Sequence, residues 1–328
     1  MQQVADWLQR KWTKELTSVA QRLGDESVLL EAQHCRWGDE HYAGNVPQLL
    51  ETTEEGIRRY DAKRHAQLAD AFGGHDPGVC ALVRHAEGLS LRGLPDQAGR
   101  AVERALVFAG SLSHTPSTAF GHAFAGASFV ILRDRHGCER TGARTVALAE
   151  KFDLPYFRWL GRYFMGWAKA QGLTLSEGLA LMEEAFTHIV NEQFYKFFGA
   201  ALAEARFDAG RVTDALALVD HAVNTGDGPA SGLYVPEVHR LRGVFLRSLG
   251  YPAAEVECTL RTALQIAEEQ GAFLLKLRAA TSMALFWRDQ GKVQQARELL
   301  APVYRWFTEG FDTRDLKEAK ALLEALAA

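Results

Sequence analysis

The amino-acid sequence predicts an all-α fold, a solenoid in which helical hairpins are stacked one after another. Three observations predict it. A set of four small or apolar residues recurs along the chain with gaps of seven, five and seven. Glycine and proline punctuate the short stretches between segments of helical periodicity. No sustained alternation of apolar and polar residues, bounded by hairpin-type turns, indicates a β-strand.

The repeated set is clearest in two copies and is kept with substitutions in two others. The copies are Ala203-Gly210-Ala215-Ala222, Ala86-Gly93-Ala98-Ala105, Ala284-Gly291-Ala296-Val303 and Trp37-Gly44-Leu49-Gly56. Their gaps match the small-residue positions of a tetratricopeptide-type hairpin, where two helices cross closely and a glycine turns the chain between them. Solenoids of such hairpins mostly bind other molecules.

The last small position of each hairpin gives the number of repeats. These positions are Gly56, Ala105, Thr145, Ala185, Ala222, Ala263 and Val303. Their gaps of 49, 40, 40, 37, 41 and 40 residues exceed the about 34 residues of a minimal tetratricopeptide repeat. The third copy is the least regular, because RDRHGCERTG (133–142) stands where its turn is expected. We therefore predict a right-handed solenoid of about seven hairpins.

We expect a single helical-repeat domain over the whole chain, 1–328. Its parts, in order, are a leading amphipathic helix (1–23), the repeats (24–311) and a capping helix (312–328). In the cap, Asp312-Thr313 can N-cap the helix DLKEAKALLEAL, whose apolar residues form one stripe and whose charges form the other face. A helix of this kind shields the last hairpin from water.

The net charge and the number and spacing of the cysteines indicate which classes of partner and which cellular compartment to expect. The 37 basic and 41 acidic residues leave a net charge of −4, so neither nucleic acid nor an anionic membrane is expected as a partner. No apolar run approaches the roughly 18 residues of a membrane span, and the N-terminus lacks the apolar core of a signal peptide. The four cysteines are widely spaced, which favours a reducing compartment. We expect a soluble, cytoplasmic protein.

Two segments carry a more specific resemblance. They are residues 60–106, with the loop GGHDPGVC (73–80), and residues 296–326, with the turn WFTEGFDT (306–313). Both resemble the C-terminal repeat region of bacterial regulators that join a cyclase or DNA-binding module to an AAA-type ATPase, a region related to the repeat domain of the maltose-regulon activator. The likeness covers nearly the whole chain and implies a sensor or interaction part of a signalling protein. The chain has no GxxxxGKS/T phosphate loop, so neither ATPase nor cyclase activity is implied for it.

The concave face, lined by the first helix of each hairpin, is the expected binding surface. In the tetratricopeptide register, its second half carries basic residues that could hold a carboxylate or phosphate through bidentate arginine contacts. A solvated helix face with scattered charges is the alternative. The candidate ligand-binding residues are Trp159, Arg162, Tyr163, Lys169, Glu204, Arg240, Arg247, Arg278 and Arg288, with His34, His41 and Glu87 in the first half.

An aromatic stripe adds to this surface. Trp159, Tyr163 and Trp167 follow an i, i+4, i+8 spacing, which places them on one side of a helix. Such a stripe is either a stacking wall for a flat ligand or peptide, or core between helices.

We expect no metal site and no cofactor. His34 and His41 are seven residues apart on one predicted helix, hence about 10 Å apart along its axis, too far for one ion. His75 belongs to a glycine-rich loop in which Asp76 is expected to N-cap the next helix, with Pro77 at its first position.

A non-enzymatic binding or sensor module is therefore favoured, with a protein, a peptide or a small anionic effector in the groove; self-association is left open. A protein partner predicts a long open groove, whereas an effector predicts a closed ring or a deep hole.

The alternative is an enzyme with its site in the groove or central hole. No GxSxG, HExxH or paired-carboxylate signature supports it. An enzyme predicts a buried cluster of His, Glu or Arg from at least three hairpins within about 4 Å of a common point, and such a cluster would rule out binding as the only function.

Overall fold

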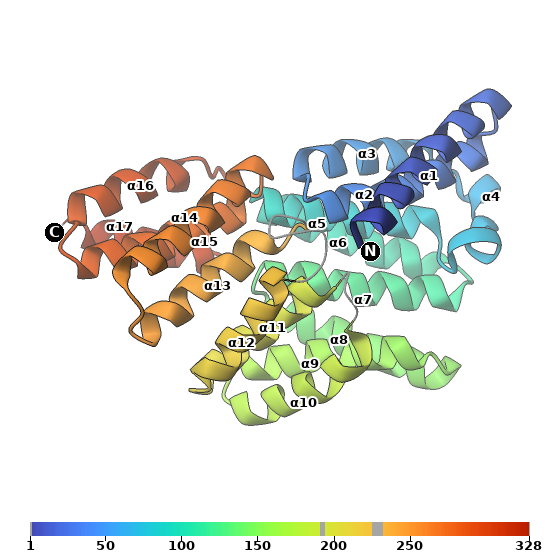
Figure 1. The fold of residues 1–328 in the computed structure, drawn as a ribbon. Coiled ribbons are helices and arrows are strands. Elements are labelled where there is room, and N and C mark those ends of the chain that lie inside the picture. The colour runs from blue at the N-terminus through green and yellow to red at the C-terminus, as the bar shows by residue number, and fades with distance from the viewer. Residues whose placement is uncertain (1, 191–193, 225–231, 328) are drawn as a thin grey trace.

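The structure, a computed structural model, describes residues 2–190, 194–224 and 232–327, with the backbone alone for residues 2–11. Within these ranges every regular element is a helix, and the helices pair into antiparallel hairpins (Figure 1). No helix among them is both long enough and apolar enough to span a membrane.

Seven hairpins follow one another in the described part of the chain. The first four are α2 (Glu26–Ala43) with α3 (Val46–Arg59), α5 (Pro77–Arg92) with α6 (Pro95–Ser111), α7 (Thr115–Ile131) with α8 (Arg135–Phe152), and α9 (Pro155–Ala170) with α10 (Leu175–Ile189). The last three are α11 (Tyr195–Asp208) with α12 (Val212–Asn224), α13 (Val235–Ser248) with α14 (Ala253–Glu269), and α15 (Phe273–Asp289) with α16 (Val293–Arg305). Helix α1 (Gln2–Leu23) precedes them and α17 (Arg314–Ala325) follows. The predicted α-solenoid of seven tetratricopeptide-like hairpins with a C-terminal helix is confirmed.

The spacing of 49 residues between the first two hairpins has a structural cause. A short helix α4 (Ala62–His65) and a π-helical turn η1 (Ala69–Gly73) are inserted between α3 and α5. The loop that follows η1 carries His75 and leads to Asp76, which N-caps α5 by accepting from the Val79 amide, with Pro77 at the first helical position as predicted.

Small residues let the helices approach closely. Ala105, Ala185, Ala222 and Ala263, each at the last small position of its repeat, are fully buried. Between α9 and α10 the approach is close enough that a Cβ on Gly178 would lie 2.3 Å from the amide nitrogen of Ala170. The buried alanines and Gly178 thus stand where a larger side chain would separate two helices, whereas Gly210 and Gly291 meet the need of the turn for a positive φ.

The two ends of the solenoid meet, so the superhelix is closed. Figure 1 shows the C-terminal hairpins beside α5, and α15 contacts α5 directly. The amide of Val46 donates to the carbonyl of Gln270 at 3.2 Å. Further along this seam, the amide of Gln97 donates to Glu309 at 3.0 Å, and Gly310 packs against Pro95. The contacts join the first two hairpins to the last two.

Helix α17 does more than cap the last hairpin. Leu316, Ala319 and Leu322 are buried, as the predicted apolar stripe requires. The expectation that the charges of this helix form a separate outer face is wrong for Asp315, which is 6% exposed and points into the closed superhelix. This carboxylate is turned inward because Arg278 of α15 binds it with two hydrogen bonds.

Candidate functional site

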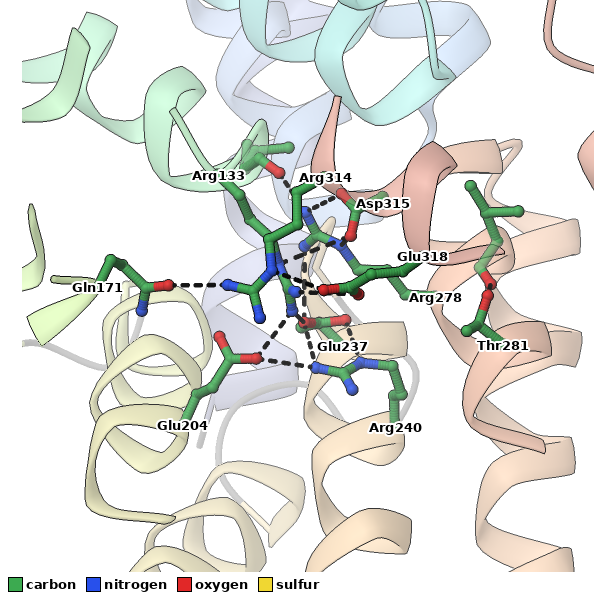
Figure 2. Close-up of polar contacts among 12 residues, drawn as sticks. Arg133, Gln171, Glu204, Glu237, Arg240, Arg278, Thr281, Arg314, Asp315 and Glu318 are labelled. Carbon is green, nitrogen blue, oxygen red and sulfur yellow. Dashed lines mark hydrogen bonds and ion pairs between the residues drawn. The ribbon is translucent and has the colours of Figure 1, made fainter. Parts of the chain in front are cut away.

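Charged side chains from five segments meet inside the closed superhelix (Figure 2). The segments are the α7–α8 turn, α11, α13, α15 and α17. We call this group the Arg–carboxylate cluster; it consists of Arg133, Glu204, Glu237, Arg240, Arg278, Arg314, Asp315 and Glu318.

Arg133 lies at the centre of the Arg–carboxylate cluster. Its guanidinium is 2.8 Å from Glu204, 3.6 Å from Asp315, and 3.9 Å from both Glu237 and Glu318. One buried cation is therefore shared by four carboxylates that come from three helices. Such sharing ties α11, α13 and α17 to the α7–α8 turn through charge rather than through apolar packing.

The backbone of Arg133 is also unusual. In five hairpins the turn residue has a positive φ and is a glycine, for example Gly93 with φ 85° and Gly210 with φ 77°. The α7–α8 turn makes the same pair of hydrogen bonds with Arg133 at φ 56°. A left-handed conformation costs a residue with a Cβ roughly 1–2 kcal/mol. At this position the chain adopts a strained backbone conformation, and the arginine side chain contacts the carboxylates of the cluster, which a glycine could not do.

Two buried carboxylates hold the arginines in place. Glu237 accepts two hydrogen bonds of 2.8 Å from Arg240 and lies 3.6 Å from Arg278. Burial alone would raise the pKa of Glu237, but the charges of Arg240 and Arg278 outweigh it and lower that pKa to about 2. Asp315 accepts bonds of 2.9 and 2.8 Å from Arg278, whose charge likewise overcomes burial and lowers the pKa of Asp315. Both carboxylates stay ionised at neutral pH.

A cavity of about 260 Å³ adjoins the Arg–carboxylate cluster. Its charged wall comprises five arginines and four carboxylates, and its apolar wall includes Phe207 and Leu285. The charged residues are Arg133, Arg240, Arg247, Arg278, Arg314, Glu204, Asp208, Asp315 and Glu318. Burial, followed by the charge of Glu204, raises the pKa of Asp208. The cavity is large enough for a small organic anion and offers it planar donors.

A second polar cluster lies in the first two hairpins. Nε2 of His34 on α2 is 3.0 Å from Nε2 of His75, in the loop before α5. Sγ of Cys80, in the first turns of α5, and one ring nitrogen of each histidine all lie within 4.8 Å of one another. Nδ1 of His34 is 3.2 Å from the carboxylate of Glu31. We call these four residues the His–Cys cluster.

Charge pairing changes the protonation of the His–Cys cluster. Burial by itself raises the pKa of the Cys80 thiol, but the charge and hydrogen bonds of His34 and His75 lower it to about 5. Burial likewise works against a charged His34, yet the pairing with Cys80 and Glu31 raises the pKa of His34 to about 10. At neutral pH this arrangement corresponds to a thiolate beside an imidazolium.

Next to the His–Cys cluster, Glu87 lies between the guanidinium of Arg84 and the ring of His41. Arg84 donates to it at 2.8 Å, and Nδ1 of His41 lies 3.4 Å away. Burial raises the pKa of Glu87, but His41 and Arg84 outweigh it and lower that pKa to about 2. The first-half candidates therefore fall in one region, with His34 in the His–Cys cluster and His41 and Glu87 beside it.

The remaining sequence-predicted residues divide into two groups. The cavity wall brings together Glu204, Arg240, Arg247 and Arg278. Away from the cavity lie Trp159, which stacks on His188; Arg162, which pairs with Glu184; Tyr163, which is fully buried and bonds to the carbonyl of Phe198; Lys169, which pairs with Glu177; and Arg288, which pairs with Asp289. In the aromatic stripe, Tyr163 and Trp167 are core residues between helices.

The sequence reasoning missed several residues of both clusters. Arg133 belongs to residues 133–142, where the third repeat is irregular. An arginine at the turn position that is glycine in five other hairpins is the signal by which the sequence could have identified it. The sequence pattern of the last helix predicts that Asp315 is a surface charge. His75 and Cys80 are separated from His34 by 41 and 46 residues, and no local spacing could pair them.

The Arg–carboxylate cluster also meets the geometric condition stated for an enzyme, since Glu and Arg side chains of more than three hairpins converge within about 4 Å. Its two most buried carboxylates, Glu237 and Asp315, nevertheless have lowered pKa values. Such groups bind cations well and are poor proton donors at neutral pH. Geometry alone therefore leaves both binding and catalysis open at this cavity.

No protein-family model matches the chain. An uncharacterized protein of Rhizobium meliloti (strain 1021) is 26% identical over 275 residues, which cover 82% of this chain and 26% of that protein. The chain thus spans about a quarter of the length of this relative.

Solved structures with related helical arrangements include yeast Tom70 (TM-score 0.44, 13% identity, 98% of this chain and 59% of that chain). The Cut9–Hcn1 hetero-tetramer of APC/C is similar at a TM-score of 0.42 (12% identity, 97% of this chain and 59% of that chain). A tetratricopeptide repeat protein from Parabacteroides merdae ATCC 43184 is similar at 0.44 (12% identity, 83% of this chain and 99% of that chain). The assignment of a tetratricopeptide-like solenoid rests on the hairpin order and the closing contacts described above.

Proposed function

We propose that this chain is a binding and sensor module that takes a small anionic effector, a carboxylate or phosphate compound, into the cavity beside the Arg–carboxylate cluster. The observation that carries the proposal is the convergence of five arginines from four segments, the α7–α8 turn, α13, α15 and α17, on one cavity wall. Planar guanidinium groups bind carboxylate and phosphate oxygens in pairs, which supplies both affinity and orientation.

The carboxylates of the cluster play two different roles in this proposal. Glu237 and Asp315 are nearly inaccessible, with side chains 2% and 5% exposed, and they position Arg240 and Arg278. Glu204 and Glu318 are 25% and 49% exposed and pair with Arg133 from the cavity side. An incoming anion replaces these two accessible carboxylates as partners of the arginines, while the inner pairs stay in place.

Closure of the superhelix supports an effector in preference to a protein partner. A long open groove is what a protein or peptide partner requires, whereas the first two hairpins here contact the last two. The cavity lies where α11, α13, α15 and α17 meet the α7–α8 turn. An anion bound there contacts several hairpins at once, so binding stabilises the closed superhelix. The presence of the anion can therefore change how much of the protein is in the closed conformation.

We further propose that this module works as part of a longer regulator. Two observations support this: the resemblance of residues 60–106 and 296–326 to repeat regions of bacterial cyclase and ATPase regulators, and the relative that is about four times as long as the matched segment. In such an architecture the anion state of the cavity would set the activity of another domain.

Thermal denaturation and calorimetry of the purified chain with inorganic phosphate, succinate and a nucleoside monophosphate test the proposal. At least one compound is expected to stabilise the wild type, by about 2.7 kcal/mol at a hundred times its Kd. Arg314→Gln, which removes an accessible cavity arginine, should weaken that stabilisation, whereas the control Arg58→Gln, at an exposed pair with Glu54 on α3, should not. Equal responses of the two variants would contradict the proposal.

An enzyme with its active site in the same cavity is the second candidate, favoured by the convergence of Glu and Arg from several hairpins. Asp208 is its natural proton donor, because it lines the cavity and its pKa is raised. Mass spectrometry of a stabilising compound after incubation with the chain separates the two functions. Conversion that Asp208→Asn abolishes supports the enzyme, whereas unchanged compound supports the sensor.

A further inference from the structure

Three donor atoms of the His–Cys cluster converge on one point. They are one ring nitrogen of His34, one ring nitrogen of His75 and Sγ of Cys80, and all lie within 4.8 Å of one another. The residues come from α2, from the loop after η1 and from α5, so the folded chain, and not a local motif, brings them together.

The spacing of these atoms fits a tetrahedral metal ion. Zinc binds histidine nitrogen at about 2.0–2.1 Å and thiolate sulfur at about 2.3 Å, which places ligand nitrogens about 3.3 Å apart and nitrogen and sulfur about 3.6 Å apart. The two imidazole nitrogens are 3.0 Å apart, and the largest separation in the set is no more than 4.8 Å. Shifts of a few tenths of an ångström to about 1 Å complete the geometry.

The surroundings hold the ligands as metal sites require. Nδ1 of His34 faces the carboxylate of Glu31 at 3.2 Å, which is the carboxylate–histidine arrangement that orients a ligating imidazole. The ring of His75 is stacked on Phe120, with centroids 3.7 Å apart and planes 11° from parallel. The free thiol of Cys80 is buried. Each ligand is thus held by a neighbour outside the set or by burial.

We propose that His34, His75 and Cys80 form a binding site for Zn²⁺, with Glu31 as the carboxylate that orients His34. Binding displaces the proton of the His34 imidazolium to solvent, and the resulting set of two imidazoles and a thiolate favours a borderline-soft ion over Ca²⁺ or Mg²⁺, which prefer oxygen ligands. Three protein ligands leave one tetrahedral position for water or an exogenous ligand.

Metal binding at this site would have a structural consequence. His34 belongs to the first hairpin, and Cys80 to the first helix of the second. His75 belongs to the insertion that separates these two hairpins. An ion held by all three therefore joins the hairpins and fixes the inserted loop between them.

Titration of the full chain with Co²⁺ and Zn²⁺ under reducing conditions tests the proposal. Co²⁺ is expected to give the near-ultraviolet thiolate charge-transfer band and the visible bands of a tetrahedral site, and one equivalent of Zn²⁺ is expected to remove them. Glu31→Gln should lower the Zn²⁺ affinity by about 10–100-fold, and loss of a direct ligand in Cys80→Ser or His75→Gln should lower it further.

The controls use residues of the same types outside the set. Cys258→Ser changes an exposed cysteine and His122→Gln changes a histidine outside the cluster, and both should bind Co²⁺ and Zn²⁺ as the wild type does. His75→Gln lies in a loop, so it keeps the test decisive if the buried Cys80→Ser variant does not fold. A wild type without the charge-transfer band, or a band that survives in both Cys80→Ser and His75→Gln, overturns the proposal.

Discussion

The Arg–carboxylate cluster and the His–Cys cluster are built in the same way and suit different ligands. Each collects side chains from segments that are separated in the sequence, and each contains a carboxylate that holds a cationic or basic partner, Glu237 for Arg240 and Glu31 for His34. They differ in the atoms they present. The first offers guanidinium groups to an anion, and the second offers imidazole nitrogens and a thiol to a metal ion.

The two clusters depend on different parts of the fold. The Arg–carboxylate cluster lies where the last hairpins and α17 meet the α7–α8 turn, so it depends on closure. The His–Cys cluster lies between the first two hairpins and depends on the inserted loop after η1. Loss of one is therefore expected to leave the other intact, and the predictions below separate them in order of expected effect.

The largest effect is expected from Arg278→Ala. This change leaves Asp315 and Glu237 buried without one of their partners, which costs about 3–5 kcal/mol of unfolding free energy. Urea denaturation measures it, and Zn²⁺ binding at the other cluster should persist in the folded fraction. A loss no greater than that of Arg288→Ala, at an exposed pair worth under about 1 kcal/mol, would contradict a central role for the cluster.

Acid should act next most strongly, and through the same cluster. The folded-state pKa of Glu237 is about 2, below the ordinary value of 4.5, so its stabilising effect is present above about pH 4.5 and is lost as the pH falls toward 2. Thermal melting between pH 7 and pH 2 measures this loss. In Glu237→Gln the dependence should be shallower, because the variant lacks the group that takes up the proton. Identical profiles for both proteins are the contrary outcome.

Two variants of Arg133 distinguish the energetic cost of its positive φ from the contribution of its guanidinium group. Arg133→Gly removes both the guanidinium and the cost of a positive φ, whereas Arg133→Ala removes only the guanidinium. We expect the glycine variant to be more stable than the alanine variant by about 1 kcal/mol. Both should lose the thermal stabilisation by an anion. If the alanine variant is the more stable, the turn is not strained.

The smallest effect is expected outside both clusters. Arg162 pairs with Glu184 on the surface of α9 and α10, and exposed pairs contribute under about 1 kcal/mol. Arg162→Ala should therefore leave both the anion response and the Zn²⁺ affinity unchanged. A weakened anion response would extend the binding surface to the residues around Trp159.

Most of the fold can be predicted from the repeat pattern, because close packing between paired helices requires small residues at fixed intervals. Ala105 and Ala222 are buried at the predicted positions, and the register of the first helices placed Glu204, Arg240 and Arg278 on the inner face. Arg133 and Asp315 escaped prediction because their roles arise only when the superhelix closes. His75 and Cys80 escaped because an insertion outside the repeat register brings them to His34.

Anomalous diffraction from a single crystal soaked in tungstate and Zn²⁺ tests the central comparison most directly. Tungstate stands in for phosphate, and the two elements are separated by their absorption edges. We predict tungsten in the cavity, within hydrogen-bond distance of cavity arginines such as Arg133 and Arg314, and zinc between His34, His75 and Cys80. Tungsten away from the cavity arginines, or zinc bound only at other residues, would contradict the account.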